Sequence, residues 1–124
     1  MAGPADTTHD AASALVSHYL RSKGRVFIGT TVANGKDQDL GVGALRAWND
    51  GNSDEWAGPH TERIIPLQLA WVNDPQVAAD DIRRNAARGF KAVSFPENPV
   101  DLGLAPMISK HWDPFLRACE ETET

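Results

Sequence analysis

The 124-residue chain has little of several features that mark particular classes of protein. Its single cysteine, Cys119, excludes an internal disulfide and any Cys-x-x-Cys zinc or redox motif. Twelve basic against seventeen acidic residues leave a net charge of −5, so no basic field favours nucleic acid or an anionic membrane. No apolar run approaches the roughly 18–20 residues of a membrane helix. These absences predict a soluble, cytoplasmic protein with neither nucleic acid nor a membrane as partner.

Several catalytic motifs are also missing. Gly41 and Gly43 begin like a dinucleotide-binding loop, but Arg46 stands where the third glycine would be. The chain contains no phosphate-binding Gly-x-x-x-x-Gly-Lys-Ser/Thr loop, no Gly-x-Ser-x-Gly nucleophile elbow and no His-Glu-x-x-His zinc motif. The four histidines lack the close spacings of metal ligands, which favours surface or hydrogen-bonded roles. These are His9, His18, His60 and His111.

What is present is the composition of one globular domain, with 41% apolar and 23% charged residues. Residues 1–10 contain no large apolar side chain apart from the first methionine and are expected to form an unpacked leader, which leaves residues 11–124 for the domain. Cys119 is expected to be a small core residue rather than a nucleophile, because the sequence places no Lys, His or helix N-terminus where it would lower the pKa of the thiol.

Hydrophobic periodicity predicts helices that alternate with strands. Apolar residues at helical spacing predict helices over residues 11–21 and 40–56, whereas β-branched and aromatic runs predict strands over residues 26–32, 63–70 and 90–95. The strands at 63–70 and 90–95 should be parallel, because a helix connects them.

Two Asp-Pro pairs mark the starts of further helices. Asp74-Pro75 and Asp113-Pro114 each combine a capping carboxylate with a proline at the first helical position, and Gly89 is expected to end the first of these helices. On that helix, Asp80 and Arg84 are expected to form an exposed i,i+4 ion pair with no functional role.

Four segments together resemble the amidohydrolase-related family of metal-dependent hydrolases and decarboxylases, in its aminocarboxymuconate-semialdehyde-decarboxylase-like branch. The likeness spans residues 40–121, about two thirds of the chain. The segments that carry it are Ala47-Trp48-Asn49-Asp50, Arg63-Ile64-Ile65-Pro66-Leu67, Asn85-Ala86-Ala87-Arg88-Gly89-Phe90-Lys91-Ala92-Val93 and His111-Trp112-Asp113-Pro114-Phe115.

The resemblance implies an α/β fold, namely a fragment of a (β/α)8 TIM-like barrel with about three strands and flanking helices. It implies a hydrolase acting on a small organic substrate, or a decarboxylase of a small carboxylic acid, that uses a divalent metal such as zinc or manganese. The family holds its metal through a His-x-His pair that these residues lack, so the fragment is expected to bind no metal and to be inactive alone. Gly51, where the family often has an aromatic residue, departs from the pattern.

Candidate substrate-binding residues lie in the long connection at residues 96–111. It leaves the carboxyl end of a parallel strand, where α/β folds bind their ligands. The resemblance matches Glu97, Asn98 and His111 to the rim of the family's pocket. The alternatives are a solvated turn for Glu97 and Asn98, and a residue that only precedes a helix for His111. A second interpretation of the whole chain is a non-catalytic α/β domain that self-associates through open sheet edges.

Overall fold

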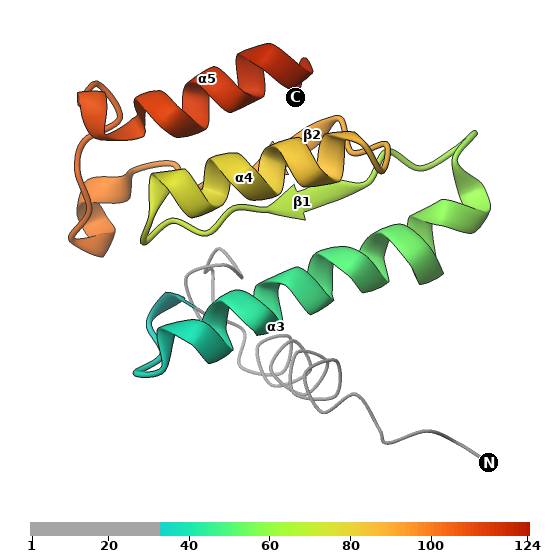
Figure 1. Cartoon of the computed structure of the whole chain (residues 1–124), viewed down its shortest axis with the longest axis horizontal. Coiled ribbons are helices and arrows are strands. Elements are labelled where there is room, and N and C mark those ends of the chain that lie inside the picture. The colour runs from blue at the N-terminus through green and yellow to red at the C-terminus, as the bar shows by residue number, and fades with distance from the viewer. Residues whose placement is uncertain (1–32) are drawn as a thin grey trace.

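The computed structural model describes residues 33–124, so the expected leader (1–10), helix (11–21) and strand (26–32) lie outside the described residues. Three longer helices and two short strands form the described part, joined by a π-helical segment and 3-10 turns (Figure 1). In chain order the elements are α3 (Gln38–Gly51), the π-helix (Asn52–Ala57), a 3-10 turn (Gly58–His60), β1 (Leu67–Leu69), α4 (Pro75–Ala86), β2 (Ala92–Ser94), 3-10 turns at Pro99–Leu102 and Lys110–Trp112, and α5 (Asp113–Thr122).

The helices begin close to where the sequence predicts. The Asp37 carboxylate accepts a hydrogen bond from the Leu40 N–H and starts α3, and Asp74 caps α4 by accepting from Gln76 and Val77. The Asp113-Pro114 helix start is also confirmed, although Asp113 is the first helical residue and its side chain caps nothing. α4 ends at Ala86, and Gly89 follows with a φ of 95°, a left-handed conformation that suits glycine.

The predicted β-α-β unit is confirmed. β1 and β2 are parallel and α4 connects them, with Gln68 aligned with Val93. Each strand is shorter than expected. Pro66 lacks a backbone N–H for the ladder just before β1 begins, and Pro96 follows two residues after β2 ends.

The prediction of a TIM-like barrel fragment is wrong. The described residues form a small, mostly helical domain whose sheet has two short parallel strands. A barrel repeats strands long enough to pack layers of side chains inside a closed sheet. Here helices rather than further strands cover the sheet, and three-residue strands supply too few inward side chains for such layers.

Two apolar clusters hold the described elements together. In the first, Leu45 of α3 packs with Leu69 of β1 and with Trp71 beyond the strand. In the second, α4 and α5 pack side by side against one face of the sheet, with Ile82 and Phe115 at the centre. In Figure 1 the strands accordingly lie between α3 on one side and α5 on the other, with α4 in front of them.

Candidate functional site

Two of the three predicted substrate-binding residues lie where the sequence places them in the fold. Glu97 and Asn98 follow the carboxyl end of β2, and both are exposed. Asn98 occupies the N-cap position of the Pro99–Leu102 turn, but its side-chain amide forms no capping hydrogen bond to the turn. Pro96 and Pro99, on either side of the pair, are buried and fix the path of the backbone.

His111 returns to the same end of the sheet through aromatic contacts. Its ring lies edge-on to Trp112 at a centroid distance of 4.8 Å, and Trp112 lies edge-on to Phe95 at 5.0 Å. Phe95 directly precedes Pro96 and Glu97, and it also stacks on Phe115. The buried Trp112 is anchored by a hydrogen bond that its indole N–H donates to the Ala105 carbonyl. His111 itself is exposed.

The three residues are not joined by a direct contact within residues 33–124. No described hydrogen bond or ion pair links Glu97, Asn98 and His111, and the His111 backbone N–H donates to the Ser109 hydroxyl instead. An open cavity of about 330 Å³ lies elsewhere, lined by His60, Arg63 and Ile64 in the turn that precedes β1. Substrate binding by the predicted trio therefore stays a prediction.

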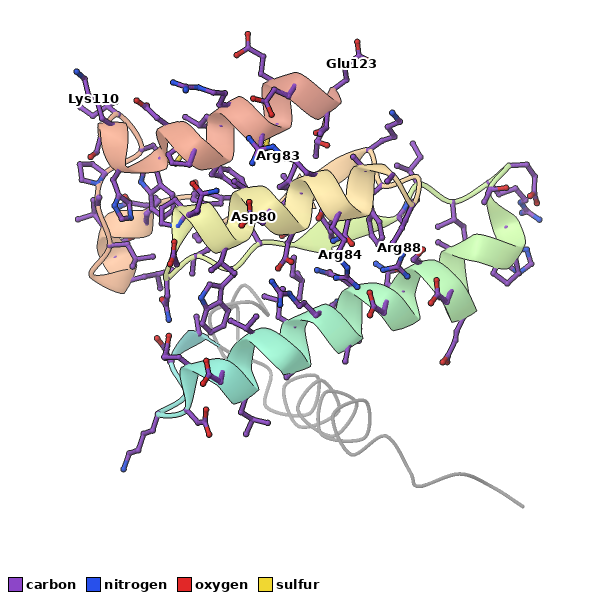
Figure 2. The ribbon with its side chains drawn as sticks, in the orientation of Figure 1. Asp80, Arg83, Arg84, Arg88, Lys110 and Glu123 are labelled. Atoms are coloured by element: carbon purple, nitrogen blue, oxygen red, sulfur yellow. The ribbon has the colours of Figure 1, made fainter. Side chains whose placement is uncertain are left out.

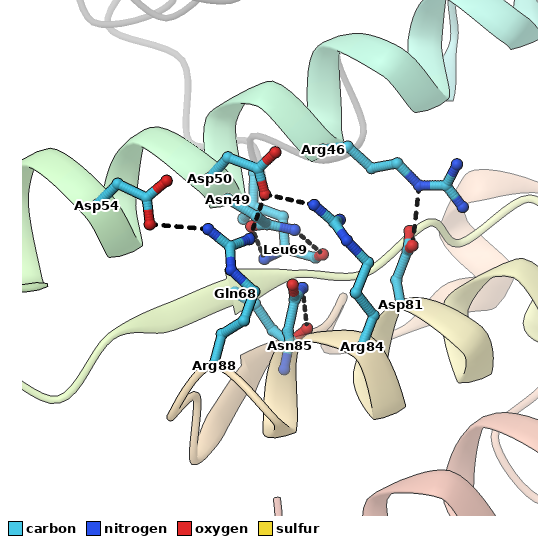
Figure 3. Close-up of polar contacts among 10 residues, drawn as sticks. All are labelled: Arg46, Asn49, Asp50, Asp54, Gln68, Leu69, Asp81, Arg84, Asn85 and Arg88. Carbon is cyan, nitrogen blue, oxygen red and sulfur yellow. Dashed lines mark hydrogen bonds and ion pairs between the residues drawn. The ribbon is translucent and has the colours of Figure 1, made fainter.

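A polar cluster that the sequence did not predict closes the outer edge of β1 (Figure 3). The side chain of Asn49, which is completely buried, donates from Nδ2 to the Leu69 carbonyl over 3.0 Å and accepts from the Leu69 N–H over 2.8 Å. One turn later, Asn52 donates to the Leu67 carbonyl over 2.8 Å. We call Asn49 and Asn52 the amide clamp, because their side chains occupy the place of a neighbouring strand.

Ion pairs connect α3 to α4 beside the amide clamp. Arg84 pairs with Asp50 at 2.6 Å, and Arg88 contacts both Asp50 and Asp54, the latter at 2.8 Å. The expected Asp80–Arg84 pair is therefore wrong, because Arg84 reaches across to α3. Figure 2 shows Arg84, from α4, and Arg88, from the turn that follows α4, extending toward α3.

A further ion pair is partly buried. Arg46 contacts Asp81 at 2.8 Å, and the Asp81 side chain is only 3% exposed. Burial raises the pKa of Asp81 above its ordinary value, because desolvation of the carboxylate outweighs the attraction of Arg46. On α5, burial raises the pKa of the half-buried Cys119 thiol, and Cys119 packs against the second apolar cluster as expected of a core residue.

Comparison with known proteins gives no matching family model and no matching characterised protein. Within residues 33–124, no group of three or more His, Cys, Asp or Glu side chains could hold a metal ion. None of the described helices is both long enough and apolar enough to cross a membrane.

Proposed function

We propose that this chain contributes substrate-contacting residues to a metal-dependent hydrolase acting on a small organic molecule, or to a decarboxylase of a small carboxylic acid. The observation that supports the proposal is the position of Glu97 and Asn98 at the carboxyl end of β2, after a parallel β-α-β unit. Parallel α/β units bind their ligands at this end of the sheet. The ordered resemblance of four segments to the amidohydrolase-related family supplies the reaction class.

The three residues offer complementary groups to a small polar substrate. The Glu97 carboxylate accepts hydrogen bonds or a proton, and the Asn98 amide both donates and accepts. The His111 imidazole donates and accepts, and its ring lies edge-on to the buried Trp112 ring. The described residues do not fit the metal that the family uses, so its ligands would come from outside residues 33–124.

Ligand binding tests the substrate-contacting role directly. The ¹⁵N-labelled chain is titrated with small carboxylic acids and amides, such as benzoate, malonate and benzamide. We expect saturable amide shifts at Glu97, Asn98 and His111, and their loss in Asn98→Ala and His111→Ala. Glu62→Gln, an exposed residue before β1, is the matched control. Shifts confined to His60 and Arg63, or no saturable shift with any probe, would contradict the proposal.

The source of the metal ligands is tested separately. Metal analysis of the purified chain should find far less than one zinc or manganese ion per chain, because a stable site needs three or four convergent ligands. About one tightly held ion per chain would contradict this assignment. The genomic sequence on both sides of these codons gives an independent measurement, since the proposal expects an in-frame His-x-His upstream and a strand ending in His downstream.

A further inference from the structure

We draw no further inference here: the strongest candidate, the apolar surface patch made by the exposed Trp56 of the π-helix and the exposed Ile65 and Leu67 at the start of β1, is an unpartnered face, and nothing in the residues that the structure describes shows what covers it.

Discussion

Asn49→Ala should destabilise the domain far more than Asn52→Ala, although both remove an asparagine that binds the same strand. Asn49 is fully buried and satisfies both backbone groups of Leu69, whereas the Asn52 hydrogen bond to Leu67 is exposed to solvent. An unsatisfied buried backbone group costs about 1–3 kcal/mol, so leaving two unsatisfied costs about 2–6 kcal/mol. Water can replace Asn52, which limits its effect to about 0.5–1 kcal/mol.

The size of the effect makes it easy to measure. The free energy of unfolding of a domain of this size is roughly 5–15 kcal/mol, so Asn49→Ala removes a large part of that free energy. Urea unfolding followed by tryptophan fluorescence suits the chain, because Trp71 and Trp112 are buried in the folded protein and become exposed on unfolding. The free energy of unfolding falls by about 1–2 kcal/mol for each molar increase in urea concentration. The urea concentration at the unfolding midpoint should therefore fall by more than about 1 M. Equal effects of the two substitutions would refute a strand-like role for Asn49.

Three further outcomes are expected. Because burial raises the pKa of Asp81, the folded state binds a proton more readily than the unfolded state. This group's stabilising contribution is greatest below about pH 4 and is lost as the pH rises through the raised pKa. The stability of Asp81→Asn relative to wild type should therefore rise between pH 4 and pH 7 in urea titrations, and a fall would contradict the reasoning. Arg88→Ala should cost more than Arg84→Ala, about 1 kcal/mol against less than 0.5, because Arg88 is less exposed and contacts two carboxylates; equal unfolding midpoints would count against the pairing shown. Cys119 should react with iodoacetamide more slowly in the folded protein than in urea, since burial raises the pKa of its thiol, and equal rates would show that the thiol is accessible.

Local signals in the sequence predicted much of the described fold. Asp74-Pro75 fixes the start of α4 because the carboxylate and the proline ring act within one turn of the helix. The parallel pairing of β1 and β2 followed from the helix between them, since a parallel connection needs a crossover. Strand lengths were overestimated, because periodicity alone does not show where the ladder ends.

What the sequence did not predict depends on partners distant along the chain. Asn49 lies on an ordinary amphipathic helix, and its hydrogen-bond partner Leu69 is twenty residues away. Arg84 has an acidic residue four positions earlier, yet it pairs with Asp50 on another helix. For the candidate site, the sequence placed Glu97 and Asn98 after β2, but it gave no sign of the aromatic contacts that Trp112 makes with Phe95 and His111.

The amide clamp also limits how the sheet can grow. An unpaired strand edge is a template for another strand, and a unit with such an edge on each side assembles into a filament. Asn49 and Asn52 act as an end group on the outer side of β1, because their side chains bond to the backbone groups that an added strand would use. Disrupting the clamp would expose these groups, and the first sign would be the growth of aggregates.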